Sequence, residues 1–163
     1  MKPSPLPLEE QAQCCWALAN SYSAAASRLI AEGSAETFLP SVFLLLHALE
    51  LHFKAFLFSR GVSDKQLRKV GHDLLACLRA CKERGFALHV ELSWLQQMQV
   101  ARVNVYYKEK ELEYFVPQAK RFGSIERLSQ TVHQVAKGIF NPITEKSFRA
   151  LSRQATSQET PSK

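Results

Sequence analysis

Three polar residues share one face of an otherwise apolar segment of the chain. His47, Glu50 and Lys54 stand at positions i, i+3 and i+7, within about 60° of one another on a helix that turns 100° per residue. A carboxylate and an ammonium in an apolar helix are costly unless they pair or form other hydrogen bonds. The stripe therefore predicts a Glu50–Lys54 pair that fixes packing register, a ligand or catalytic groove, or an oligomer interface.

A second compact motif is Gly71-His72-Asp73-Leu74-Leu75. Glycine permits a break, after which the side chain of His72 or Asp73 can cap the following helix. His72 is also a candidate partner for Glu50 across the fold, and a histidine beside a carboxylate can transfer protons near neutral pH. The candidate ligand-binding residues are therefore His47, Glu50, Lys54, His72 and Asp73.

The candidate catalytic residues lie near the end of the chain. Arg127 and His133 are six positions apart. A guanidinium stabilises phosphate charge, and an imidazole acts as acid or base in metal-free RNA cleavage, in which the 2′-hydroxyl attacks the adjacent phosphate. On a straight helix the two side chains lie about 120° apart. They would converge on one phosphate only if the helix bends or if two copies meet at a dimer interface; a chance occurrence is the alternative.

Other chemistries have no matching motif in the sequence. It contains no Gly-rich phosphate loop, no His-Glu-x-x-His zinc site and no Gly-x-Ser-x-Gly elbow, so we expect no metal and no cofactor. Tyr106, Tyr107 and Tyr114 stand among lysines and glutamates and could stack on nucleic-acid bases. The alternating charges favour a solvated helix face instead.

Composition indicates one ordinary globular domain. The chain has 163 residues, of which 46% are hydrophobic and 22% charged, and a chain of this length buries enough surface for a self-sufficient core. We expect a single domain over residues 1–154 and a polar, disordered tail over 155–163. The net charge of +6, concentrated in the last third, favours an anionic partner such as RNA.

Cysteine usage and the apolar segments suggest a cytoplasmic protein. The four cysteines, Cys14-Cys15 and Cys77-x-x-x-Cys81, have no metal-knuckle spacing and are expected to be reduced thiols. The most apolar stretch, residues 38–46, is too short to span a membrane before it meets His47, and the N-terminus lacks the features of a secretory signal.

Apolar periodicity and capping signals predict only helices. We expect one helix from near residue 8 to Gly33 and an apolar, central one from Glu36 to about Arg60, in which Pro40 is tolerable only in the first turn. The fold class is all-α, an up-and-down antiparallel bundle of four or five helices. The remaining boundary signals are the capping boxes Ser63-x-x-Gln66 and Ser93-x-x-Gln96, the break at Gly71, the stop at Gly85, the start at Gly123-Ser124 and the end at Asn141-Pro142.

The two polar motifs together resemble a HEPN domain. The carrying residues are His47-Ala-Leu-Glu-Leu-His-Phe-Lys54, followed by Gly71-His72-Asp73-Leu74-Leu75, and the resemblance covers roughly residues 38–116, including a segment that ends Leu-Glu-Tyr-Phe-Val-Pro117. It implies a bundle of four or five helices that is frequently dimeric.

The resemblance also implies a range of activities. Many HEPN proteins are metal-independent RNases of toxin–antitoxin, phage-defence and RNA-processing systems, with an Arg-x(4–6)-His motif across a dimer interface. Others are inactive partners, some of them paired with nucleotidyltransferases. Arg84 and His89 have the spacing, but Gly85 lies between them, so we prefer Arg127 and His133.

Three hypotheses follow. The leading one is a cytoplasmic, homodimeric HEPN-like module that binds RNA or a nucleotide through a groove bordered by Glu50, Lys54, His72 and the basic last third. The second is a metal-independent endoribonuclease with His133 as general acid and base and Arg127 as phosphate clamp. The third is a non-catalytic subunit whose Tyr-rich and apolar surfaces dock a partner such as an antitoxin or a nucleotidyltransferase.

Overall fold

The computed structural model describes residues 6–114 and 120–145, and within these ranges the chain is helical without any strand. The all-α prediction is therefore confirmed. The helices are α1 (Leu8–Glu32), α2 (Ala35–Ser59), α3 (Asp64–Val70), α4 (Leu74–Lys82), α5 (Trp94–Lys108) and α6 (Ile125–Gly138), with a short 3-10 turn, η1 (Phe86–Leu88), between α4 and α5.

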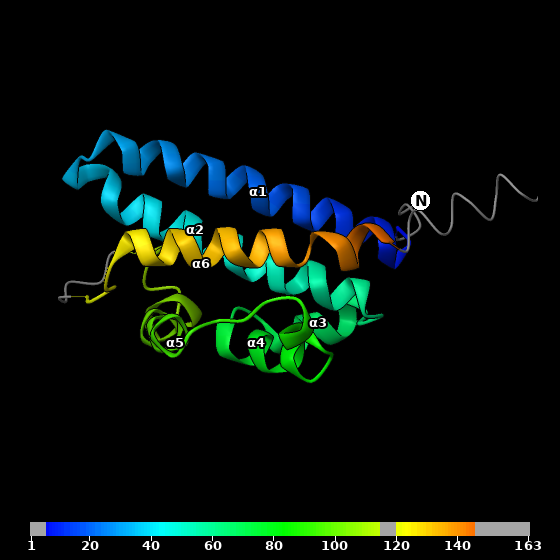
Figure 1. The fold of residues 1–163 in the computed structure, drawn as a ribbon. Helices are drawn as coiled ribbons and strands as arrows, with labels where there is room; N and C mark the ends of the chain where they lie inside the picture. The colour runs from blue at the N-terminus through cyan, green and yellow to red at the C-terminus, as the bar shows by residue number, and fades with distance from the viewer. Residues whose placement is uncertain (1–5, 115–119, 146–163) are drawn as a thin grey trace, which may run out of the picture.

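The long helices form a bundle whose directions differ from the prediction. Helices α1 and α2 make an antiparallel hairpin, and α6 lies along both of them, running in the same direction as α2 (Figure 1). Helices α3 to α5 lie on one side of this group, and α5 is seen nearly end-on, so it crosses the long axis (Figure 1). A strictly up-and-down antiparallel order is thus wrong, because three helices between α2 and α6 return the chain to the starting end of α2.

The helix count also differs from the four or five expected. The break expected at Gly71 is present and divides residues 63–85 into the two separate helices α3 and α4. The capping boxes at Ser63 and Ser93 are both present. Ser124 caps α6 by accepting from the backbone N–H of Arg127.

Helix α2 is the central element. Its apolar side chains on most sides are fully buried, among them Leu45, Leu49 and Phe53. By length and composition α2 would also be able to cross a membrane, a test that the core helix of a soluble protein passes as well, and most of it is covered by the other helices. Pro40 lies at the sixth residue of α2, beyond the first turn to which we confined it, and it has no N–H to donate to the carbonyl of Glu36.

The last helix ends earlier than predicted, at Gly138 rather than at Asn141-Pro142. A β-carbon on Gly138 would lie 2.5 Å from Val90 Cγ2 and 2.6 Å from the His89 carbonyl oxygen, so only glycine allows α6 to approach this loop. A further helical segment begins at residue 140, and Pro142 is its third residue, where no intrahelical donor is needed. The predicted tail, 155–163, and Pro117 lie outside the described residues.

Candidate functional site

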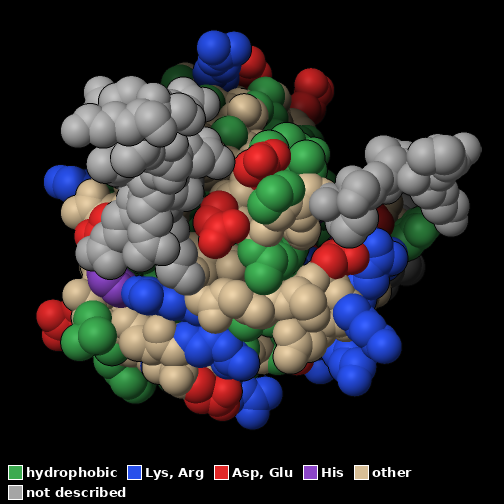
Figure 2. Space-filling view, turned by 90° about the vertical axis from the view of Figure 1, so that its right-hand side faces the viewer, with side chains coloured by type: hydrophobic (Ala, Val, Ile, Leu, Met, Phe, Trp, Pro, Cys, Tyr) green, Lys and Arg blue, Asp and Glu red, His purple; other side chains and the backbone are tan. Residues whose placement is uncertain are grey.

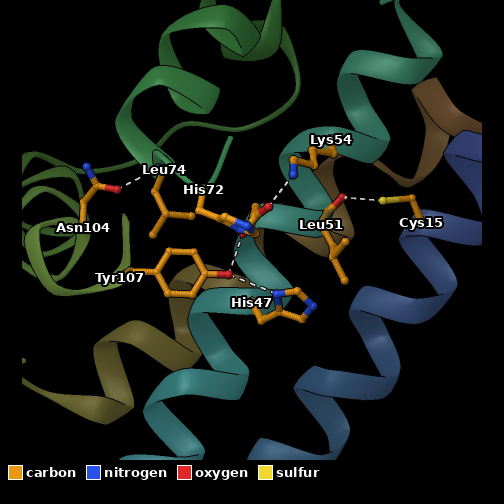
Figure 3. Close-up of polar contacts among 9 residues, drawn as sticks. Cys15, His47, Leu51, Lys54, His72, Leu74, Asn104 and Tyr107 are labelled. Carbon is orange, nitrogen blue, oxygen red and sulfur yellow. Dashed lines mark hydrogen bonds and ion pairs between the residues drawn. The ribbon is translucent and has the colours of Figure 1, made fainter. Parts of the chain in front are cut away.

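The polar stripe of α2 is built around one buried carboxylate. The Glu50 side chain is only 1% exposed, and it accepts hydrogen bonds from three donors on three segments of the chain. Lys54, one turn further along α2, pairs with Oε1. Oε2 accepts from the Tyr107 hydroxyl of α5 at 2.6 Å and from His72 Nδ1, just before α4, at 3.0 Å. Figure 3 shows the side chains of His72 and Tyr107 converging on α2 between His47 and Lys54.

These contacts keep Glu50 ionised. Burial by itself would raise the pKa of the Glu50 carboxyl, but the hydrogen bonds from Lys54 and Tyr107, together with the Lys54 charge, hold that pKa below its ordinary value. Burial and the neighbouring Glu50 charge raise the pKa of Tyr107, so its hydroxyl keeps the proton that it donates. The sequence-predicted Glu50–Lys54 pair and the Glu50–His72 contact are both present.

His47 closes the other end of this network. Because the Tyr107 hydroxyl donates to Glu50, its oxygen is free to accept from His47 Nδ1, which lies 3.0 Å away. Burial lowers the pKa of His47, so the ring is neutral and carries its proton on Nδ1. His47 also stacks on Phe43 and meets the edge of Tyr22 from α1, so this partly buried ring packs against aromatic side chains on two helices.

Asp73 acts as a helix cap in this structure. Its Oδ1 accepts from the Ala76 backbone N–H at 2.9 Å and from Asn104 Nδ2 at 3.1 Å. Asn104 Oδ1 in turn accepts a hydrogen bond from the Leu74 backbone N–H at 2.7 Å. The Asn104 side-chain amide therefore forms hydrogen bonds with both Asp73 and Leu74. Burial would raise the pKa of Asp73, but the hydrogen bonds from Ala76 and Asn104 lower it.

Asn104 and Tyr107 are the network members that sequence reasoning did not identify. Both lie on α5, three residues apart and therefore on one face. The sequence favours a solvated helix face for Tyr107, with base stacking as the alternative, yet Tyr107 is 4% exposed and its hydroxyl donates to Glu50. The sequence pattern that could have identified them is an Asn and a Tyr on one helical face next to apolar Val100 and Val103, which is typical of polar side chains on a buried face.

Arg127 and His133 are not brought together by any contact in the described part of the chain. Arg127 is half-buried and lines a cavity of about 170 Å³ with Trp94 and Met98. His133 is exposed, and its Nδ1 donates to the Ser129 carbonyl at 2.8 Å. Their convergence across a dimer interface stays a prediction.

The Arg84–His89 pair is divided as the sequence indicated. Gly85 adopts φ +82° between them, a left-handed conformation that only glycine takes up readily. Arg84 Nη1 donates a hydrogen bond to the Ala80 carbonyl oxygen at 3.0 Å. His89 instead forms a hydrogen bond through Nε2 with Arg60 Nη2, at 2.6 Å.

A groove runs between α4 and α5 beside the Glu50 network. It encloses about 440 Å³, and Arg79, Lys82 and Lys108 line it. Asp73 and Asn104, which belong to the cap described above, also line this groove. The network and the groove therefore share the junction at which α4 starts against α5.

The thiols and the other possible metal-ligating side chains show no metal-site arrangement in the part of the chain that the structure describes. Within the described residues, no group of three or more His, Cys, Asp and Glu side chains is placed to hold a metal ion. The cysteines are free thiols, and burial raises the pKa of Cys15 and of Cys77 to about 12, which leaves both thiols protonated and poorly nucleophilic.

No family model, no curated protein and no solved structure matches this chain.

Proposed function

We propose that this chain is a HEPN-like RNA-binding module and that the groove between α4 and α5 is its site. The observation that supports the proposal is the placement of Arg79, Lys82 and Lys108 around one cavity of about 440 Å³. Pairing of Lys and Arg with phosphates supplies most of the affinity of proteins for nucleic acids. Asp73 is the acidic side chain on the groove lining, and its Oδ1 accepts hydrogen bonds from Ala76 and Asn104.

In this proposal the Glu50 network positions the groove walls rather than contacting RNA. Tyr107 ties α5 to α2, and Asn104 ties α5 to the start of α4. His72 is the most exposed of the three side chains that contact Glu50, with 43% of its side chain exposed against 19% for Lys54. The proposed groove therefore differs from the sequence-based one, whose border consisted of Glu50, Lys54, His72 and the basic last third of the chain.

Charge reversal in the groove tests the proposal. We expect Arg79→Glu/Lys82→Glu/Lys108→Glu to weaken binding of a fluorescent single-stranded RNA at least 30-fold in low salt, measured by anisotropy in EDTA. Loss of three phosphate contacts should also reduce the slope of log K against log salt by about 2.

The matched control changes the same amount of charge elsewhere. Lys65, Lys69 and Lys137 are exposed, and α3, which carries the first two, lies at the end of the molecule shown in Figure 2, where basic side chains mix with acidic, apolar and other ones. Reversing these three charges should weaken binding less than 5-fold. Equal losses in both triple variants, or no binding by the native protein, would reject the groove.

A second candidate function is metal-free RNA cleavage, and the geometry of His72 favours it. The buried Glu50 carboxylate accepts from His72 Nδ1–H, which leaves Nε2 of a half-exposed ring free to act as a base. Nε2 would take the proton of the 2′-hydroxyl, O2′ would bond to phosphorus, and the 5′-oxygen would leave and take a proton from solvent. The products would be a 2′,3′-cyclic phosphate and a 5′-hydroxyl.

Cleavage of labelled mixed RNA in EDTA distinguishes His72 from His133 as the catalytic histidine. We expect His72→Ala to lower the rate about 10²–10⁴-fold, the range for loss of a general base, while folded His133→Ala retains it. Loss only in His133→Ala would assign cleavage to Arg127 and His133. A native protein that binds RNA without cutting it would reject the catalytic candidate and leave the binding proposal intact.

A further inference from the structure

The solvent-facing side of α5 is apolar. Trp94, Met98 and Val105 are 69%, 48% and 55% exposed, and Ala101 lies between them. These four positions follow the spacing i, i+4, i+7 and i+11 and occupy an arc of about 60° on the helix. We call them the α5 stripe. A surface helix ordinarily turns polar residues outward, and a contiguous exposed apolar surface marks an interaction site.

Packing among the described residues does not account for the α5 stripe. The core-facing side of α5 has its own apolar residues, Val100 and Val103, which are fully buried. It also buries polar Gln99 and Asn104, at 6% and 4% exposure. Apolar residues therefore lie on both faces of α5, and only one of these faces is covered by the described helices.

Cations flank the α5 stripe on both sides. Lys82 and Lys108 lie on one side, along the groove between α4 and α5. Arg102 and Arg127 lie on the other, along the smaller cavity that also includes Trp94 and Met98. Within the described part of the chain, neither of these arginine side chains forms a hydrogen bond or an ion pair.

We propose that the α5 stripe docks an amphipathic helix of a partner protein, with an apolar seam bordered on both sides by Asp and Glu. The stripe has the spacing with which one helix packs along another. An acidic border would pair with the cations on both flanks, and such pairs set partner choice. A second copy of this chain would instead align α5 with α5 and oppose these cations with one another.

If RNA binds in the groove as proposed above, docking at the α5 stripe would also affect RNA binding. Lys82 and Lys108 border both the α5 stripe and the groove, so a docked acidic helix would neutralise cations that the RNA phosphates need. The partner helix would therefore compete with RNA for this side of the molecule.

Two synthetic helical peptides provide the test with the full chain. Both carry the same leucine seam over three heptads; one has Glu at the flanking positions and the other has Lys. We expect the acidic peptide to bind at least 30-fold more tightly by isothermal titration calorimetry. We also expect Met98→Ser/Val105→Ser to weaken it at least 10-fold.

The matched control removes exposed apolar side chains elsewhere. Leu18 and Leu88 are 48% and 85% exposed, and Leu18→Ser/Leu88→Ser should change the affinity less than 3-fold. Similar binding of both peptides, or no effect of the stripe variant, would overturn the docking proposal. Concentration-dependent self-association that the stripe variant abolishes would overturn it in favour of a second copy.

A competition titration distinguishes this inference from the proposed function. Displacement of bound RNA by the acidic peptide is the expected result. Tight peptide binding that leaves RNA bound would retain the docking site and reject the placement of RNA beside it. Failure of the peptide to bind, with RNA affinity lowered by Met98→Ser/Val105→Ser, would show that RNA itself covers the α5 stripe.

Discussion

Replacing Glu50 with glutamine is expected to lower the free energy of unfolding by about 2 to 4 kcal/mol. The carboxylate is 1% exposed and accepts from Lys54, Tyr107 and His72. Removing one partner of a buried charge network leaves the others unpaired and costs about 3–5 kcal/mol. The expected loss is somewhat smaller, because Lys54 and His72 are partly exposed and can turn to water. Urea unfolding of Glu50→Gln at pH 7 measures it.

Glu83→Gln is the matched control. Glu83 is 72% exposed and lies 3.5 Å from Arg84, so its loss should cost less than about 0.5 kcal/mol. If Glu50→Gln is as stable as Glu83→Gln, the network does not stabilise the junction of α2, α4 and α5. If Glu50→Gln is destabilised but still binds RNA with native affinity when folded, the network does not position the groove.

The second large effect is a pH dependence of stability that originates at His52. This residue is fully buried on α2, and neither of its ring nitrogens has a hydrogen-bond partner in the described part of the chain. Burial, with a smaller contribution from His133, lowers the pKa of His52 from 6.5 to about 4. Below pH 6.5 the His52 ring therefore binds a proton in the unfolded chain, whereas in the folded chain it does so only below about pH 4. The free energy of unfolding consequently falls as the pH drops through this window.

The measurement compares the native chain with His52→Leu. Between pH 7 and pH 4.5 the native protein should lose about 2 to 3 kcal/mol more stability than the variant, since one pKa unit corresponds to about 1.4 kcal/mol. Comparison with a variant is needed because burial also lowers the pKa of His47, which adds a loss in the same direction. Parallel stability curves for the two proteins would mean that His52 finds a partner or water in solution.

Most helix boundaries could be predicted from the sequence because their signals are local. Ser63 and Ser93 carry the capping boxes in their own neighbouring residues. The need for glycine at position 138 could not be predicted, because it comes from the close approach of Val90, which lies almost 50 residues earlier in the chain. The same direction of α2 and α6 is likewise a property of tertiary packing, which periodicity does not encode.

The candidate site was predictable where its members share an element. His47, Glu50 and Lys54 could be grouped because one helix fixes their spacing. The contribution of Tyr107 depends on how α5 is rotated against α2, and α5 has apolar residues on both faces, so its sequence does not indicate which face is buried. The polar network and the α5 stripe both result from this one rotation.

The path of α6 along both α1 and α2 also matters while the protein is being made. The indole N–H of Trp16 in α1 donates to the carbonyl of Ala136 in α6 at 3.1 Å, so the last long helix closes over the first. A ribosome completes α2 about 80 residues before it completes α6, which corresponds to roughly 4 to 16 s at about 5–20 residues per second. During that interval the most apolar helix of the chain lacks its α6 cover, and the nascent protein is most exposed to chaperones and to aggregation.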